Sequence, residues 1–527
     1  MLHLKNWQGS QKGIYSLIFL LPLTVLLFSR CGQGKSYQEE KITMEAFSDM
    51  KTPIFVFDFP SIQRHLSSIA NSESGITEAD RCTKEIYQET KHLIWIDKTG
   101  VDHRADSLLV WLRQVNEIGM SPNAFGVASI EQDLQRIRTL DVDGEKDMSQ
   151  LAARLEYALT KACLRYTYGE RYGYVNPHRI FNRLLPDKQD TMGHVISYQG
   201  LFDIDMDLPQ SDYYQTVLHK VEVDSIDSYL KAIQPKDPIY IQFKQMLDTV
   251  QGDVQRQRIL CNMERSRWRY THPIPTEGRR IIVNIPAFHL YAYAPDTILD
   301  MKVVCGGQDT RTPQLTSEIE WMEVNPKWVI PMSIIKNDVV RHVGDNSYFD
   351  RNRYKIYDKA TNKQVPVGQI SRNMILSGNY RVAQDGGAGN SLGRIVFRFK
   401  NKYSVFLHDT STPGAFSRAS RALSHGCVRV SKPFDLAHFV LNTSDDWLLD
   451  RIRISMDMPP QTDQGKKYLS KHPNSEHKLI GYVPVKPHVP LYIIYYTIWP
   501  DQDGVMQTWP DVYNYDNVIW EHLKPYL

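Results

Sequence analysis

The hydrophobic pattern of this 527-residue chain changes near residue 278, and that change limits the folds that the chain can adopt. Before it, apolar residues recur at helical spacing, as in the stretch 151–169, where one stripe includes Cys163. After it, β-branched and aromatic runs alternate with turn signals, as strands do. The sequence therefore predicts an α+β protein, with an α-helical scaffold domain over 51–270 and a mainly β domain, sandwich or barrel-like, over 271–527.

Composition adds three finer boundaries. The polar stretch 32–50 is typical of a linker. Residues 331–385 have a mixed, polar character and are predicted to be an insertion in the β domain that moves as a flap. The C-terminal segment 485–527, strand-like and then helical, is predicted to complete the β domain.

The N-terminus carries an export signal. Lys5 and Lys12 precede an apolar run, Ile14 to Phe28, which has the length of a signal-peptide core and is short for a membrane span. Cys31 follows in a context that resembles the lipid-attachment site of bacterial lipoproteins, although Arg30 replaces the expected small residue. Residues 1–31 are thus expected to be a signal peptide or a membrane or lipid anchor. The rest of the chain is expected on the periplasmic side of the cell envelope.

Charge and cysteine content exclude several classes of partner and cofactor. With 62 basic and 60 acidic residues the chain has no overall field for nucleic acid, and no nucleic-acid partner is expected. After Cys31 an odd number of cysteines remains, so at least one thiol stays unpaired in the monomer. We expect neither a metal nor a cofactor, because no cysteine has metal-type spacing. A set formed by His408, His425, Cys427 and His438 matches no zinc pattern.

Cys427 lies in a segment whose residue types suit nucleophilic catalysis. A cysteine attacks as its thiolate, which requires a lowered pKa or a base within hydrogen-bond reach. His408, at the end of a predicted strand, is the candidate proton donor and acceptor. Asp409 follows it and can orient the imidazole through either its carboxylate or its backbone carbonyl.

The neighbours of Cys427 have candidate supporting roles. Gly426 permits a tight turn, and the amides of Gly426 and Cys427 are candidates for an oxyanion hole. Ser424 is expected to donate supporting hydrogen bonds, and His425 to shape the turn or support the site electrostatically. Arg421 and Arg429 are candidates for binding a substrate carboxylate, with plain surface charge as the alternative.

The spacing of these residues resembles the signature of the L,D-transpeptidases, cysteine enzymes of the bacterial cell wall. His408 is followed by fifteen residues and then by Ser424-His425-Gly426-Cys427. Arg429 stands where that family often has asparagine. Other segments resemble its long multidomain branch with a capping lid: "NMERSRWRY", "IVNIPAFHLYAY", "GGQDTRTPQL", "VNPKWVIPMSI", "GNSLGRIVF" and "PLYIIYYTIWPDQDG". The small peptidoglycan-binding module common in that branch is absent.

The resemblance implies an activity. Cys427 would attack the carbonyl of the third residue of a tetrapeptide stem and expel the terminal D-alanine, while His408 moves the proton. An amine of a second stem would then attack the thioester and form a 3→3 cross-link, with residues 331–385 acting as the lid. The implied partners are the donor tetrapeptide, the amine acceptor and carbapenem β-lactams as covalent inhibitors. The alternatives are an L,D-carboxypeptidase or endopeptidase that uses the same cysteine, and a catalytically silent wall scaffold.

Overall fold

The structure is a computed structural model that describes residues 58–89, 92–97, 100–143, 145–473 and 478–527. The predicted N-terminal features, namely the segment 1–31 with Cys31 and the linker 32–50, lie outside the described residues. Within the described ranges, the helices are all too short or too polar to cross a membrane.

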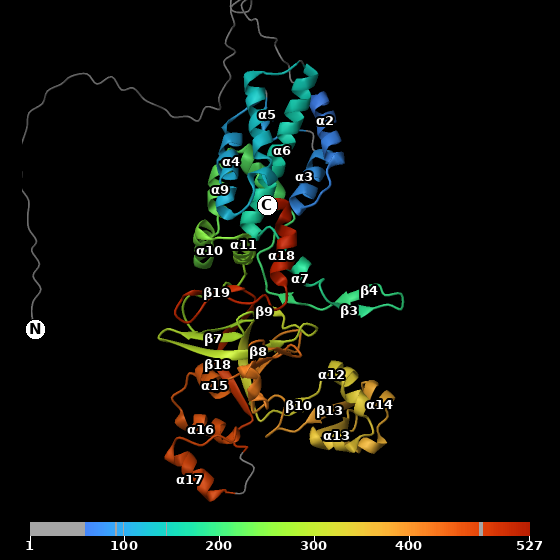
Figure 1. Ribbon diagram of the computed structural model, residues 1–527, viewed down its shortest axis with the longest axis vertical. Coiled ribbons are helices and arrows are strands. Elements are labelled where there is room, and N and C mark those ends of the chain that lie inside the picture. Colours follow the sequence, from blue (N-terminus) through green and yellow to red (C-terminus); the bar gives the residue numbers. More distant parts are fainter. Residues whose placement is uncertain (1–57, 90–91, 98–99, 144, 474–477) are drawn as a thin grey trace, which may run out of the picture. The chain divides into compact units, whose positions relative to one another are not determined.

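The N-terminal part of the described chain is a helical assembly around α6 (Glu145–Tyr172). The predicted apolar stripe of this helix is its core face, because Leu151, Leu155, Leu159 and Cys163 are all fully buried. Helices α2 to α5, α8, α9 and α11 contact α6 or one another (Figure 1). The helices of this part are α2 (Phe59–Ser72), α3 (Glu78–Glu89), α4 (His103–Arg113), η1 (Val115–Ile118), η2 (Pro122–Phe125), α5 (Val127–Thr139), α7 (Pro177–Phe181), α8 (Tyr213–Glu222), α9 (Ile226–Ile233), α10 (Pro238–Thr249) and α11 (Asp253–Arg267). Its short strands are β1 (Ile96–Asp97), β2 (Gly100–Val101), β3 (Pro186–Gln189), β4 (Val195–Tyr198) and β5 (Phe202–Asp203).

The β part is a closed barrel. Its strands follow the order β14-β15-β17-β8-β7-β6-β18-β9, and β9 pairs again with β14, so the sheet has no free edge along this ring. β5 adds to β9, and β16 pairs with β8. The strands are β6 (Arg280–Asn284), β7 (His289–Ala294), β8 (Thr297–Gly306), β9 (Gln314–Val324), β14 (Ile395–Phe399), β15 (Leu407–His408), β16 (Ala422–Ser424), β17 (Val428–Val430) and β18 (Tyr482–Ile494). Helices α15 (Pro433–Leu441), α16 (Asp446–Ser455) and α17 (Asp463–Lys471) lie between β17 and β18 in sequence. The α+β class with a barrel-like β domain is confirmed.

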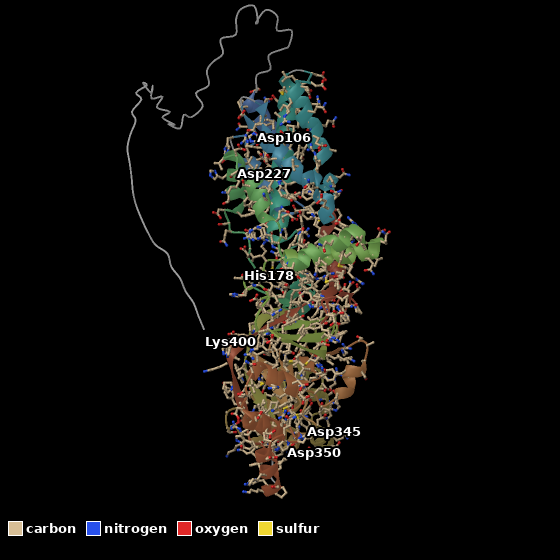
Figure 2. The ribbon with its side chains drawn as sticks, turned by 90° about the vertical axis from the view of Figure 1, so that its left-hand side faces the viewer. Asp106, His178, Asp227, Asp345, Asp350 and Lys400 are labelled. Atoms are coloured by element: carbon tan, nitrogen blue, oxygen red, sulfur yellow. The ribbon has the colours of Figure 1, made fainter. Side chains whose placement is uncertain are left out.

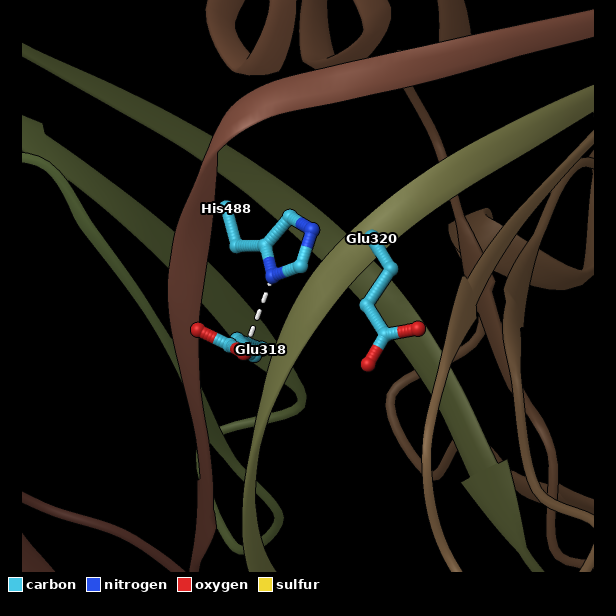
Figure 3. Close-up of side chains that lie close together, drawn as sticks. All are labelled: Glu318, Glu320 and His488. Carbon is cyan, nitrogen blue, oxygen red and sulfur yellow. Dashed lines mark hydrogen bonds and ion pairs between the residues drawn. The ribbon is translucent and has the colours of Figure 1, made fainter.

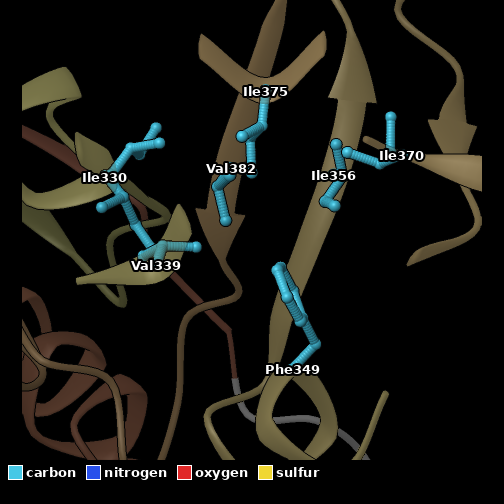
Figure 4. Close-up of a cluster of buried hydrophobic side chains, with 8 residues drawn as sticks. Ile330, Val339, Phe349, Ile356, Ile370, Ile375 and Val382 are labelled. Atoms are coloured by element: carbon cyan, nitrogen blue, oxygen red, sulfur yellow. The ribbon is translucent and has the colours of Figure 1, made fainter. Parts of the chain in front are cut away.

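The insertion between β9 and β14 is a folded subdomain. Its strands β10 (Trp328–Val329), β11 (Tyr354–Asp358), β12 (Gln364–Val365) and β13 (Tyr380–Gln384) form a sheet in the order β10-β13-β11-β12. The helices α12 (Met332–Asn337), η3 (Val339–His342), α13 (Asn346–Arg351), η4 (Val367–Gln369) and α14 (Arg372–Leu376) accompany it (Figure 1). Eight buried side chains, among them Phe349 and Val382, form a separate core (Figure 4). We call residues 328–384 the insertion subdomain. Its own core shows that the predicted flap is a folded unit.

The turn between β14 and β15, which leads to His408, is irregular. Strand β15 contains Leu407 and His408 alone, and the preceding residues are irregular. Asn401 organises this stretch: its side-chain amide donates to the carbonyls of Phe399 and Val405, and its oxygen accepts from the amides of Tyr403 and Val405. These bonds replace ladder bonds that a longer strand would form.

The C-terminal segment divides between two parts of the molecule. β18 completes the barrel, and β19 (Ile498–Pro500) pairs with β20 (Met506–Thr508). The terminal helix α18 (Tyr515–Leu523) and η6 (Lys524–Tyr526) pack instead on the helical part, where Asp516 pairs with Arg265 at 2.6 Å and the amide of Ser121 donates to the carbonyl of Tyr526. The prediction that the whole segment completes the β domain is therefore wrong for its last residues, since buried ionic and aromatic contacts attach them to the helices.

Candidate active site

The barrel register places His408 and Cys427 on one face of the sheet. β15 and β17 are parallel neighbours in which Leu407 pairs with Val428 and His408 with Arg429. Because side chains alternate along a strand, His408, Arg429 and the residue two before it, Cys427, share one face. Leu407 and Val428 are fully buried on the other face. Diagonal neighbours of this kind lie about 7–8 Å apart at their Cα atoms, within reach of side chains of this length.

The imidazole of His408 is buried and held by the main chain. Its Nδ1 lies 2.5 Å from the carbonyl oxygen of Asp409. A carbonyl only accepts, so Nδ1 carries the proton and Nε2 keeps its lone pair as a base. The carboxylate of Asp409 points elsewhere and accepts the amide of Arg394 at 2.8 Å. Of the two ways in which Asp409 was predicted to orient the imidazole, the structure has the backbone carbonyl.

Both members of the pair are neutral near pH 7. Burial first, and then the positive charge of Arg429, lower the pKa of His408 to about 4, against the opposing effect of two backbone carbonyls. Burial also raises the pKa of the Cys427 thiol, although Arg398, Arg429 and the backbone at Phe406 favour the thiolate. In agreement, the thiol of Cys427 donates to the carbonyl of Ser404 at 3.7 Å. The resting site thus has a thiol and a neutral imidazole on one face of the sheet, an arrangement that suits proton transfer at the moment of attack.

The turn that carries Cys427 is held by Ser424. The hydroxyl of Ser424 donates to the carbonyl of Cys427 at 2.6 Å and accepts the amide of Gly426 at 3.1 Å. The φ of Gly426 is +109°, which side-chain-bearing residues rarely adopt. Since the amide of Gly426 is already bonded, its predicted place in an oxyanion hole is wrong. The amide of Cys427 has no hydrogen-bond partner in the described part of the chain and remains the candidate donor.

A second loop, residues 306–312, donates hydrogen bonds to main-chain carbonyls of this turn. Thr310 donates to the carbonyl of Ser424 at 2.8 Å, and Thr312 donates to the carbonyl of Gly426 at 2.9 Å. The loop is folded so tightly that a Cβ on Gly306 would lie 2.0 Å from the carbonyl oxygen of Thr310. The phenol of Tyr513 in turn donates to the carbonyl of Gly306 at 2.7 Å. The segment "GGQDTRTPQL", which includes this loop, had no role at the site predicted from the sequence.

Arg421 does not have the role that we expected from the sequence. Its guanidinium is buried and donates to the main-chain carbonyls of Val303, Phe288 and Arg418, each at 3.0 Å. It also lies over the ring of Phe288. A guanidinium whose donors are occupied by backbone oxygens joins β8 to the loop before β16 and is not available to a substrate carboxylate.

Arg429 and Arg398 make the catalytic face positive. Arg429 donates one hydrogen bond, at 3.3 Å, to Thr412, and its buried Nε has no partner among the described residues. Arg398, on β14, lies over the ring of Phe406 and forms a bidentate pair with Glu323 at 3.1 and 2.9 Å. Arg398 was not predicted from the sequence, because only the pairing of β14 with β15 brings it onto this face. The role of Arg429 as a carboxylate ligand stays a prediction.

His425 and a separate acidic group lie outside this arrangement. The side chain of His425 is exposed, so its role stays a prediction. Of the described residues, Glu318, Glu320 and His488 lie close enough together to share a metal ion (Figure 3). The carboxylate of Glu320 is paired at 2.8 Å with Lys400, which is labelled in Figure 2, and His488 with Glu318 at 2.9 Å. These partners explain the group as a surface ion-pair network.

Two protein families match the chain along the regions described above. The L,D-transpeptidase catalytic domain matches residues 278–456, which include the barrel strands that carry His408 and Cys427. Residues 278–456 thus carry an L,D-transpeptidase catalytic domain. A scaffold domain matches residues 81–247 in the helical part of the chain. The catalytic match ends before β18, although β18 is a strand of the closed barrel.

Three relatives and solved structures that match the chain share less than 30% identity with it. A Haemophilus influenzae protein described as "Putative L,D-transpeptidase" is 29% identical over 331 residues, which cover 60% of this chain and 62% of that protein. The match therefore spans less than two thirds of the relative. An L,D-transpeptidase from Mycobacterium smegmatis matches with 13% identity and a TM-score of 0.17 over 41% of this chain and 58% of its own. L,D-transpeptidase 1 of Mycobacterium tuberculosis matches with 12% identity and a TM-score of 0.14, over 41% of this chain and 62% of its own. Because the TM-scores of both solved structures are this low, the assignment of the catalytic domain rests on the sequence matches.

Proposed function

We propose that this protein is a peptidoglycan L,D-transpeptidase that forms 3→3 cross-links through a thioester on Cys427. The observation that carries the proposal is the parallel register of β15 and β17, which puts a neutral imidazole and a thiol on one face of the barrel. The family of the catalytic domain supplies the substrate class, namely stem peptides of peptidoglycan. The positive charges of Arg429 and Arg398 suit a substrate that carries carboxylates.

The reaction then runs in two steps with the protons balanced. Nε2 of His408 takes the proton of the Cys427 thiol as sulfur attacks the carbonyl carbon of the third stem residue, and the amide of Cys427 donates to the developing oxyanion. The imidazolium gives that proton to the leaving D-alanine amine, which leaves a thioester. In the second step an amine of another stem attacks the thioester, His408 removes the surplus proton from the amine, and the thiol is restored.

The proposal extends to the setting of the enzyme. The insertion subdomain would cover the bound stem peptide and exclude water, which would otherwise compete with the acceptor amine. The N-terminal segment 1–31 would export the chain and attach it to a membrane by a helix or by lipid on Cys31, with catalysis on the periplasmic side. Carbapenems would acylate Cys427 in place of a stem peptide.

Product analysis tests the proposal. The full chain is incubated with disaccharide-tetrapeptides, and mass spectrometry is expected to detect dimers that lack one D-alanine. Cys427→Ala should abolish them, while Cys82→Ala, at another half-buried free cysteine, should not. Identical dimers from wild type and Cys427→Ala would refute the proposal. Tripeptide monomers without dimers would instead identify a carboxypeptidase, and a carbapenem adduct on intact wild-type protein that Cys427→Ala lacks would exclude a silent scaffold.

A further inference from the structure

Asn390 lies in the chain segment that returns from the insertion subdomain to the barrel. Its side chain is fully buried. The amide nitrogen Nδ2 donates to the carbonyl of Asp385 at 3.0 Å, on the returning segment, and to that of Pro326 at 3.2 Å, on the outgoing segment. One side chain therefore joins both connections between the insertion subdomain and the barrel. Gln384, at the end of β13, completes the junction by accepting the amide of Ser391 at 2.8 Å.

The same residue fixes the backbone that reaches the catalytic histidine. The Oδ1 of Asn390 accepts the amide of Leu392 at 2.8 Å, and its main-chain carbonyl accepts the amide of Gly393 at 2.9 Å. Gly393 lies directly against Asp409, since a Cβ placed on it would be 2.4 Å from the Cβ of Asp409. The next amide, that of Arg394, donates to the carboxylate of Asp409 at 2.8 Å.

Asp409 is the residue whose main-chain carbonyl orients the imidazole of His408. A continuous series of hydrogen bonds and packed backbone thus runs from the two connections of the insertion subdomain, through Asn390, to the atom that fixes the histidine tautomer. If the segment after Asn390 moved by an ångström, Asp409 would move with it. A displacement of that size in a proton-transfer group lowers reactivity by about 100-fold.

We propose that Asn390 is a positioning residue that couples the insertion subdomain to His408. The inference rests on the proposed function in that it takes His408 to be the base. It adds that the placement of the insertion subdomain sets the orientation of the imidazole, so that Cys427 is activated when this subdomain is seated and loses its base when the junction opens. Asn390 lies in the segment "GNSLGRIVF", and no role for it was predicted from the sequence.

Alkylation of Cys427 by iodoacetamide tests this coupling without any peptidoglycan. The rate is followed across pH on the full chain, by mass spectrometry of the Cys427 peptide. Asn390→Ala is expected to lower the neutral-pH rate about 10- to 100-fold and to shift the pH profile to higher pH. Asn373→Ala, at an exposed asparagine of α14 in the same subdomain, should leave both unchanged. Asn390→Asp keeps the acceptor for Leu392 and loses the donors to Asp385 and Pro326. Its alkylation rate at neutral pH should therefore fall as well, and its pH profile should shift in the same direction.

A double-mutant cycle separates positioning from general destabilisation. In a His408→Gln background, Asn390→Ala should cause no further loss of Cys427 reactivity, because the effect acts through the imidazole. Additive losses, or a wild-type pH profile in a folded Asn390→Ala or Asn390→Asp protein, would overturn the proposal. Since alkylation needs no stem peptide, failure of the transpeptidase assay alone would count against the proposed function and not against the coupling.

Discussion

His408 and Arg429 are register partners in the parallel pair of β15 and β17, and their side chains leave the sheet on the same face. Burial is the main reason that the pKa of His408 is lowered, and the guanidinium of Arg429 adds to this effect because it disfavours the imidazolium. The same guanidinium favours the thiolate of Cys427, on the same face. Arg429 therefore lowers the cost of the sulfur anion while it keeps the base unprotonated.

The first prediction concerns pH. Because the pKa of His408 is lowered to about 4, the imidazole stays neutral and competent as a base well below its ordinary value of 6.5. The acid limb of kcat/KM should therefore fall through a pH near 4 and not near 6.5. The thiol pKa is raised, so alkylation of Cys427 should still be increasing at pH 9. A reactivity plateau at about pH 3.5–7.5, typical of a preformed thiolate, would contradict this assignment.

The second prediction contrasts the two arginines of the motif. Arg421→Ala should destabilise the protein by about 2–4 kcal/mol, because three buried carbonyls lose a charged donor. Arg429→Ala should leave the melting temperature nearly unchanged and lower kcat/KM for a stem peptide, since its free Nε faces no protein partner among the described residues. Chemical denaturation and steady-state kinetics on both variants, with exposed Arg418→Ala as the control, distinguish these roles. Equal effects on stability would refute the distinction.

The third prediction concerns the loop behind the catalytic turn. Gly306→Ala places a Cβ 2.0 Å from the carbonyl oxygen of Thr310, a backbone atom that cannot move without displacing the loop. The expected result is a loss of about 3 kcal/mol in stability together with slower acylation of Cys427. At Gly307 the nearest atom to a new Cβ is 3.6 Å away, so Gly307→Ala should be nearly neutral. Thermal unfolding and carbapenem acylation rates test the pair, and similar behaviour of the two variants would contradict the prediction.

The fourth prediction concerns the insertion subdomain. Phe349 is fully buried in its separate core, and Phe349→Ala should cost about 3–5 kcal/mol locally. Hydrogen exchange is expected to accelerate across β11 and β13 while β6 and β7 of the barrel keep their protection. Leu376→Ala, at an exposed position of α14, serves as the control. Uniform loss of protection throughout the barrel would show that the subdomain does not have a core of its own.

The sequence predicted those features that depend on local pattern. The helical stripe on α6 comes from a periodicity of 3.6, and the core face of this helix follows directly from it. The spacing of His408 and Cys427 identified the catalytic family, because the residue types and the separation agree together. Local pattern also predicted that the 331–385 stretch is an insertion, although its polar surface concealed a core built from widely separated residues.

The partners of the site residues depend on the pairing of strands that are distant in sequence. No local sequence pattern predicts that pairing. Arg421 and Arg429 lie eight positions apart in one motif. Main-chain carbonyls, among them that of Val303 on β8, bind the guanidinium of Arg421, whereas Arg429 lies on the catalytic face. Asp409 had two equivalent ways to hold His408, and the return of the chain through Asn390 and Arg394 selected its carbonyl by occupying its carboxylate. A side chain's composition limits what it can bind. Which donor or acceptor reaches it depends on strands that are far away in sequence, and folding alone brings those strands together.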